Sequence, residues 1–461
     1  MGRCTGRLLA ATLGGLAAMA AAPPSARGQT PEPADTAADA APPADAPGVP
    51  SGPSIDLGSR PPDGATARAC SFTLPLCVHA SAPGTPVLDA LASAERAWGL
   101  LTGALSLPSP DVDLGTGALD LYLVDHEPSV ARAVLYRRDA VSAFDRASAF
   151  VLLDGGARGC DRDAAIAREL ARASLWRTAP ATDAATAAAE TAYLARVMVP
   201  CAMGMIDGVD RFQQHPEQAI ADGLDGGAGG DERARGAALF YWWLDYSFGT
   251  EPGATVRALW ALAPTRTPLG AARWKGTPNG VDVLRTSFKN ALRTGSTIDD
   301  LWVNFAVARA FVGSADDGAH LPESRAIGAA GLVRTQWDIG WPAHARSLAS
   351  GSGVAPTGAA FIAIAHAGAP PGARLRVEAT WEEHAKMRWA VVRLDAAGKE
   401  LGHVEIPAAE RATEAQMTVV DLEGVARILV VGTNAGDPSF RFDPNDEVWE
   451  PHGWTVTVAS E

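Results

Sequence analysis

The spacing of apolar residues changes once along this chain, near residue 325. Upstream of that point, apolar residues recur at three- and four-residue steps, which indicates amphipathic helices. Downstream they alternate with polar residues, which indicates half-buried strands. The sequence therefore predicts an α+β multidomain protein, with a mostly helical domain and a small sheet first and an all-β sandwich second.

The upstream part combines helical segments with two short strand-like runs. Residues 119–124 alternate between apolar and more polar side chains, which predicts a strand. The apolar run 149–153 ends at Asp154-Gly155-Gly156, which predicts a second strand. Asp163 is the predicted cap of one helix, and Thr182 or Asp183 that of the next. The predicted helices are 86–101, 164–176, 182–199, 234–248, 254–262, 281–292 and 298–311.

The downstream part reads as short strands separated by turns, the pattern of a β-sandwich. Residues 395–398 are a predicted hairpin turn between two of these strands. Aromatic residues in this part could stack on sugars, although aromatic residues in strands are more often core residues; they are Trp381, Trp389, Trp449 and Trp454. The predicted strands are 374–381, 389–394, 400–406, 417–420, 427–431 and 454–458.

The first 28 residues read as a cleavable signal peptide. Arg3 and Arg7 precede an apolar run over 8–22, and small residues suited to cleavage follow. Residues 29–68 are rich in proline and alanine and poor in large aliphatic residues, which predicts a disordered linker. We therefore expect an exported protein, periplasmic, cell-surface or secreted, with the mostly helical domain at 69–325 and the sandwich at 326–461.

The net charge argues against several partner classes. The 461-residue chain carries a formal charge of −14 and has no long basic run. A uniformly acidic surface repels phosphate backbones and anionic lipids, so we expect no nucleic-acid partner. No stretch after the signal is long and apolar enough to suggest a transmembrane segment.

Four cysteines remain after the predicted cleavage: Cys70, Cys77, Cys160 and Cys201. An even number of cysteines in an exported chain predicts two disulfides. We expect Cys70–Cys77 and Cys160–Cys201, because the second pair would join segments at the two ends of neighbouring helices. A zinc site is the alternative, but no paired Cys-x-x-Cys supports it.

Few residue patterns suggest chemistry. Three aspartates and an asparagine lie in the last long loop, but their spacing matches no calcium-binding loop, so a solvated loop is the better interpretation; they are Asp437, Asp443, Asn445 and Asp446. The nine histidines are scattered, and His126, just after a predicted strand, is the one expected near a cleft.

One segment resembles a known family. Its order of helix, strand, strand, helix and second helix is similar to the catalytic half of gluzincin zinc metallopeptidases, over roughly residues 70–315. In that family the first helix carries His-Glu-x-x-His, whose histidines bind zinc while the glutamate deprotonates the metal-bound water. The resemblance places this motif on the segment Arg168-Glu169-Leu170-Ala171-Arg172 and the completing metal-ligand glutamate on Glu190.

The departure from the family pattern affects the metal site. Arg168 and Arg172 stand where the family has histidines, and a guanidinium has no lone pair to give to a metal ion and stays protonated. Glu169 is then a vestigial general base, and Arg168, Arg172 and Glu190 are vestigial ligand positions. We expect Glu169 and Glu190 to form ion pairs with the arginines, and we expect no bound cofactor.

Three functional hypotheses remain open. The first is a catalytically inactive metallopeptidase-like protein that binds an extracytoplasmic protein, peptide or glycan. The second is an active zinc metallopeptidase with displaced ligands, for example Glu169, Glu190 and a distant histidine. The third is a structural or adhesive envelope protein whose segment order resembles the family by chance; a simple helix with arginine and glutamate on its wet face would suit it.

Overall fold

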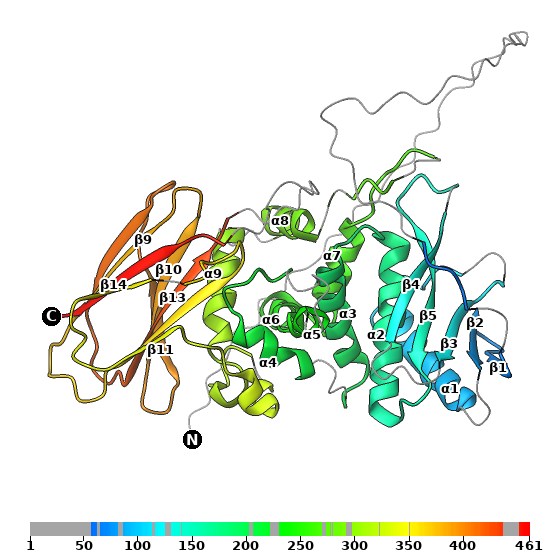
Figure 1. Ribbon diagram of the computed structural model, residues 1–461, viewed down its shortest axis with the longest axis horizontal. Coiled ribbons are helices and arrows are strands. Elements are labelled where there is room, and N and C mark those ends of the chain that lie inside the picture. Colours follow the sequence, from blue (N-terminus) through cyan, green and yellow to red (C-terminus); the bar gives the residue numbers. More distant parts are fainter. Residues whose placement is uncertain are drawn as a thin grey trace, which may run out of the picture. The chain divides into compact units, whose positions relative to one another are not determined.

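The computed structural model describes residues 57–61, 65–81, 86–112, 116–124, 131–139, 141–201, 206–221, 230–269, 273–276, 278, 280–291, 297–321, 323–349, 351–436 and 451–461. The predicted signal peptide, His126, Trp449 and the acidic residues of 437–446 lie outside the described residues. Residues 50–461 form one compact unit (Figure 1). In the described part no helix is long and apolar enough to cross a membrane.

The described helices all lie upstream of residue 332. Most follow the predicted boundaries, but the predicted helix 234–248 is two helices. The α-helices are α1 (Val87–Gly99), α2 (Gly159–Thr178), α3 (Ala184–Met198), α4 (Ile206–Gln214), α5 (Gly230–Gly236), α6 (Ala238–Phe248), α7 (Ala254–Leu262), α8 (Gly280–Ala291) and α9 (Ile298–Arg309). One π-helical turn, η1 (Leu100–Ala104), follows α1, and two 3-10 segments, η2 (Gly313–Ala315) and η3 (Ser324–Gly331), follow α9.

The helix caps test the local sequence reasoning. Asp183 caps α3 and accepts a hydrogen bond from the Thr186 amide, as predicted. The prediction for Asp163 was wrong, because α2 begins at Gly159 and extends one turn further upstream. Asp163 instead accepts a hydrogen bond from the Ser93 hydroxyl, at 2.5 Å, and thereby links α2 to α1.

The upstream part contains a five-stranded sheet of order β1-β2-β3-β5-β4. Strands β2, β3 and β5 run parallel, whereas β4 is antiparallel to β5 and lies at the edge of the sheet. Helices α1 and α2 pack together and against this sheet (Figure 1). The strands are β1 (Ala67–Cys70), β2 (Leu76–Ala80), β3 (Leu119–Val124), β4 (Ala131–Arg138) and β5 (Ala147–Asp154).

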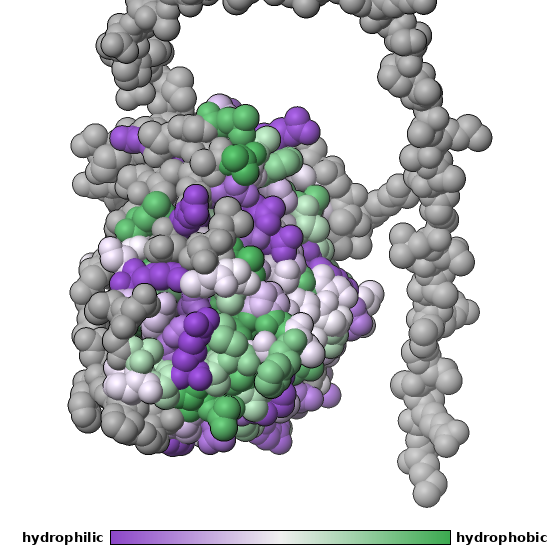
Figure 2. All heavy atoms as spheres, turned by 90° about the vertical axis from the view of Figure 1, so that its right-hand side faces the viewer, coloured by the Kyte–Doolittle hydropathy of each residue, from purple (hydrophilic) through white to green (hydrophobic). Residues whose placement is uncertain are grey.

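Both predicted disulfides are confirmed. Cys70 and Cys77 join the paired strands β1 and β2, and Cys160 at the start of α2 joins Cys201 just after α3. The linker prediction was wrong at its downstream end, because β1 begins at Ala67 and Arg60 forms an ion pair with Asp120 at 2.9 Å. On the side of the molecule with β1 and β2, hydrophobic and hydrophilic side chains are interspersed (Figure 2).

The downstream part is a β-sandwich of two antiparallel-dominated sheets, in agreement with the alternating pattern. One sheet has the order β11-β10-β13-β8-β6 and the other β12-β9-β14-β7. The strands are β6 (Trp337–Ile339), β7 (Arg346–Ala349), β8 (Ala359–Ala365), β9 (Leu375–Trp381), β10 (Met387–Leu394), β11 (Glu400–Glu405), β12 (Glu414–Val419), β13 (Arg427–Asn434) and β14 (Trp454–Ser460). Trp381, Trp389 and Trp454 are all buried in its core, so they are not sugar-stacking surface residues.

Helix α9 joins the two parts through a shared apolar core. Val303 and Val307 of α9 pack in one cluster with Phe361 of β8 and Val392 of β10. The sheet that contains β8 is therefore covered on both faces, by the second sheet and by α9. This explains why β8 is almost continuously apolar and was not found by its alternation.

A chain of titratable side chains crosses the same boundary. His320 lies between Asp317 and Glu400, with nitrogen–oxygen distances of 3.0 and 2.6 Å, and His403 contacts the second oxygen of Glu400 at 2.7 Å. Burial alone would lower the pKa of His320, but its hydrogen bonds to Glu400 and Asp317 outweigh burial and raise it. Against the effect of burial, the hydrogen bonds from both histidines lower the pKa of Glu400 to about 2.

The pKa shifts of His320 and Glu400 predict that their ion pair stabilises the fold most strongly within a limited pH range. The carboxylate of Glu400 contributes above its ordinary pKa of 4.5, and the protonated His320 contributes below its ordinary pKa of 6.5. The free energy of unfolding lost on Glu400→Gln should therefore be largest between these two values. It should shrink as the pH rises through the raised pKa of His320 or falls toward about 2.

The measurement is urea unfolding of both proteins between about pH 3 and pH 9. Glu378→Gln on β9 is the control, because Glu378 pairs with Arg376 on the exposed surface and should show a small difference. If the loss of unfolding free energy on Glu400→Gln does not change with pH, the proposed ion pair between His320 and Glu400 does not contribute to stability.

Candidate functional site

Helix α2 carries Glu169 on its buried face. Ile166, Ala167 and Leu170 are completely buried around it, so this face of α2 packs against the sheet and the neighbouring helices. Glu169 itself is also completely buried, which the interpretation of α2 as a helix with a wet Arg/Glu face does not explain. A buried carboxylate needs partners, since removing an unpaired charge from water costs several kcal/mol, about the stability of a small domain.

Three donors surround the carboxylate of Glu169. The amide N–H of Ala133 on the edge strand β4 donates to Oε2 at 2.7 Å. Arg168 Nε donates to Oε1 at 2.8 Å, and an Arg172 terminal nitrogen lies 3.6 Å from Oε2. The predicted pairing of Glu169 with both arginines is therefore present, and a main-chain amide of β4 adds to it.

The electrostatics of Glu169 favour its charged form. Burial would raise the pKa of this carboxyl, but the positive charges of Arg172 and Arg168 outweigh burial. Hydrogen bonds from Arg168 and from the Ala133 amide act in the same direction, so the pKa lies below its usual range. At neutral pH Glu169 is thus an ionised partner of two cations and is a poor proton acceptor.

The prediction that Glu190 pairs with the arginines was wrong. Glu190 lies on α3 and is almost completely buried, but its Oε2 accepts a hydrogen bond from the indole N–H of Trp260 on α7, at 2.9 Å. Tyr241 on α6 also hydrogen-bonds to it. Burial raises the pKa of Glu190 to about 8, so the carboxyl is protonated at neutral pH. A neutral Glu190 needs no cation, which is why it sits among aromatic side chains.

The donor set at this place does not suit zinc. Zinc prefers neutral imidazole, thiolate or carboxylate ligands. The described side chains here are two guanidinium groups and one carboxylate that already accepts two hydrogen bonds and forms an ion pair with Arg172. Glu190 is directed to Trp260 and cannot complete a site with Glu169 in this arrangement.

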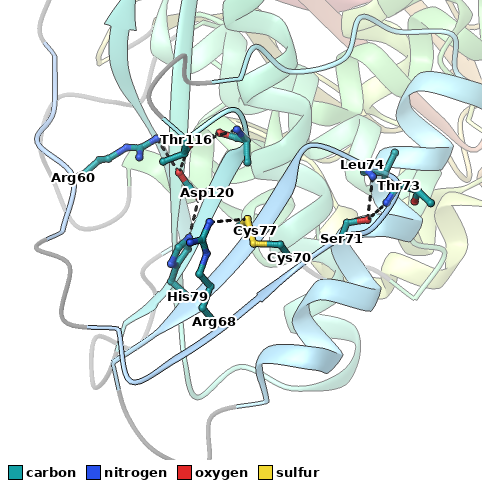
Figure 3. The surroundings of a disulfide bond; sticks show 11 residues. Arg60, Arg68, Cys70, Ser71, Thr73, Leu74, Cys77, His79, Thr116 and Asp120 are labelled. Carbon is teal, nitrogen blue, oxygen red and sulfur yellow. Dashed lines mark hydrogen bonds and ion pairs between the residues drawn. A yellow bond between two sulfur atoms is a disulfide. The ribbon is translucent and has the colours of Figure 1, made fainter.

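Elsewhere in the described part, one group of possible metal ligands lies close together: Cys77, His79 and Asp120 (Figure 3). The sulfur of Cys77 is committed to the disulfide with Cys70. His79 contacts the buried Asp120 at 2.9 Å, and Arg60 lies at the same distance from its second oxygen. This group is a disulfide beside an ion-paired carboxylate and contains neither Glu169 nor Glu190.

Sequence reasoning missed Ala133, Tyr241 and Trp260 as members of the two carboxylate sites. Ala133 contributes a main-chain amide, which no side-chain pattern can reveal. Tyr241 and Trp260 fall within the predicted helices 234–248 and 254–262, but no sequence pattern singled them out as partners of a carboxyl group. The useful signal was a glutamate inside the nearly all-apolar stretch 184–195, which indicates a buried carboxyl with dedicated partners.

Comparisons with known proteins give little similarity. No protein-family model and no curated protein matches this chain. Among solved structures, the pre-peptidase C-terminal domain of collagenase from Bacillus anthracis is 7% identical, with a TM-score of 0.18, over 28% of this chain and 97% of that one. The enzymatically active domain of tailspike protein 4 from bacteriophage CBA120 is 12% identical, with a TM-score of 0.17, over 25% and 17%. Scores this low carry no argument about fold or function.

The two buried glutamates predict opposite effects of the same substitution. Because the pKa of Glu190 is raised to about 8, its stability contribution is complete below 4.5 and is lost as the pH rises toward 8. Wild-type protein should lose up to about 1.4 kcal/mol per pH unit in this window from this group. Glu190→Gln should remove that loss, so the variant should be the more stable protein near the upper end of the window.

Glu169→Gln is the matched comparison. Because the pKa of Glu169 is lowered, the Glu169 carboxylate stabilises the fold above pH 4.5. The substitution removes the negative charge that neutralises the mostly buried Arg168 and Arg172. The variant should be destabilised at neutral pH by about 3–5 kcal/mol. Urea unfolding at several pH values measures both effects, and equal effects of the two substitutions would contradict the assignment of charge states.

Proposed function

We propose that this chain is an exported, metallopeptidase-like protein that has no catalytic zinc and binds extended peptides. The observation that carries the proposal is the arrangement of Glu169, Arg168 and Arg172 beside the edge strand β4. The arginines stand at the positions that the family resemblance gives to zinc ligands. The adjacent strand β4 is the edge of a sheet, and sheet edges bind extended peptides in other proteins.

The edge strand supports the choice of a peptide. In an antiparallel ladder, successive residues direct their N–H and C=O groups alternately to the two sides of the strand. Ala133 donates its N–H to Glu169 and not to β5, so Ala131, two residues earlier, directs its N–H to the same outer side. Unpaired groups on a sheet edge accept an extended peptide as an additional strand. The buried tryptophans of the sandwich offer no comparable support for a glycan.

Export is part of the proposal because two features agree with it. The N-terminal sequence has the charged and apolar regions of a signal peptide. The two disulfides suit an oxidising compartment.

The zinc part of the proposal predicts a metal-free wild type. Purified, dialysed protein should hold far less than one zinc per chain by mass spectrometry and should not hydrolyse casein, because guanidinium groups cannot bind the ion. Arg168→His with Arg172→His places two imidazoles one turn apart and should increase zinc uptake. Adding Glu190→Gln should leave that uptake unchanged, since Glu190 is bonded to Trp260. Stoichiometric zinc in the wild type would support an active peptidase with displaced ligands.

The peptide part predicts that β4 is the binding edge. Ala131→Pro removes an outward N–H at the first residue of an edge strand, where proline is tolerated. It should weaken binding of a peptide selected from a random synthetic library by roughly tenfold. This factor corresponds to the loss of one hydrogen bond that contributes near the upper end of the usual range of free energies.

Ala131→Thr is the control, because it keeps the N–H and suits a strand. Fluorescence polarisation with the labelled peptide gives both affinities. If wild-type protein selects no peptide, or if both variants bind equally well, the peptide proposal fails. In the first case, a structural or adhesive role becomes the better hypothesis.

A further inference from the structure

We propose that, within the peptide-binding function proposed above, Arg172 binds a carboxylate of the peptide. The ligand class is thus a peptide with either a free C-terminal carboxylate or an acidic side chain placed near the end of the strand-like segment. Arg172 would be a specificity-determining residue, which selects anionic peptides over neutral ones.

The first support is that Arg172 has unused hydrogen-bonding capacity. A guanidinium has five N–H donors in a planar fork. Among the described residues the ion-pair partner of Arg172 is Glu169, and the 3.6 Å between the two groups exceeds a hydrogen-bond distance. The Nε atom of Arg172 is buried and has no hydrogen-bond partner in the described part. Buried donors are rarely left without an acceptor in folded proteins.

The second support is that Glu169 does not satisfy this arginine in the observed geometry. Its Oε1 already accepts from Arg168 Nε at 2.8 Å, and its Oε2 already accepts from the Ala133 amide at 2.7 Å. A bidentate arginine–carboxylate pair needs both oxygens of one carboxylate aligned with the fork. Because Glu169 divides its oxygens between two other donors, the fork of Arg172 remains available to a second carboxylate.

The third support is the position of Arg172 relative to the edge strand. Arg172 and the Ala133 amide approach the same oxygen of Glu169, so the guanidinium lies beside the outer edge of β4. Its side chain is 19% exposed, which leaves part of the group accessible while most of it is shielded from water. A charge-assisted, partly desolvated pair of this kind is stronger than an exposed one and fixes the register of the added strand.

The experiment compares three forms of one peptide selected on the wild-type protein. The first has a free C-terminus, the second has a C-terminal amide, and the third has its acidic side chains replaced by amides. We expect one of the two neutralised forms to bind wild-type protein at least about tenfold more weakly, in line with the strength of hydrogen bonds to charged groups. The form that loses affinity identifies the source of the carboxylate.

Arg172→Gln should weaken binding of the anionic peptide to the level of its neutralised form and should remove the difference between them. Arg172→Lys keeps the charge without the fork and should retain part of the difference, which also covers the case in which the glutamine variant folds poorly. Arg162→Gln is the matched control, since Arg162 lies on the same helix with a similarly shielded side chain and an Nε that also has no hydrogen-bond partner in the described part. Its ion-pair partners are Asp89 and Asp163 and not Glu169 beside β4, so it should not contribute to the preference.

The outcomes separate this proposal from the one on which it rests. If wild-type protein binds a peptide along β4 but does not distinguish the three forms, Arg172 is not a carboxylate site and peptide binding stands. If Arg172→Gln keeps the preference for the anionic form, another residue provides it and the assignment to Arg172 is overturned. If no peptide binds, both proposals fail.

Discussion

The buried carboxylate of Glu169 is the interaction on which the proposed site depends. A completely buried negative charge is stable only with matched donors around it, and here they come from the same turn of α2 and from the edge strand β4. This requirement fixes α2 against the edge of the sheet. It also holds Arg168 and Arg172 beside the edge strand β4.

Glu169 and Glu190 show how surroundings decide the chemistry of one residue type. The first lies among cations and is ionised; the second lies among aromatic side chains, and burial raises its pKa to about 8. Two carboxyl groups on adjacent helices therefore differ in charge at neutral pH. Their partners differ as well, since Glu169 pairs with two arginines and Glu190 is hydrogen-bonded to Trp260.

The sequence predicted helices better than strands, and the reasons are physical. Helix α7 was predicted at its observed bounds, and the Asp183 cap was correct because capping is a local interaction. Strand β8 was missed because α9 covers its second face and removes the alternation. The predicted helix 234–248 breaks at Ala237, directly after Gly236, a glycine that marks the end of α5 and that the helical periodicity overrode. The edge strand β4 was missed as well, because its apolar and polar residues do not alternate regularly.

By itself the sequence determined the cysteine pairs, the order of a helical part before a sandwich, and the presence of arginine, which cannot bind a metal ion, at positions 168 and 172. These properties follow from residue chemistry and from short-range periodicity. Only the tertiary structure decided which partner each carboxyl has. Glu190 meets Trp260, which lies far along the chain, and Glu169 meets a main-chain amide. Contacts of this kind depend on how α2, α3 and α7 pack, and no local pattern encodes them.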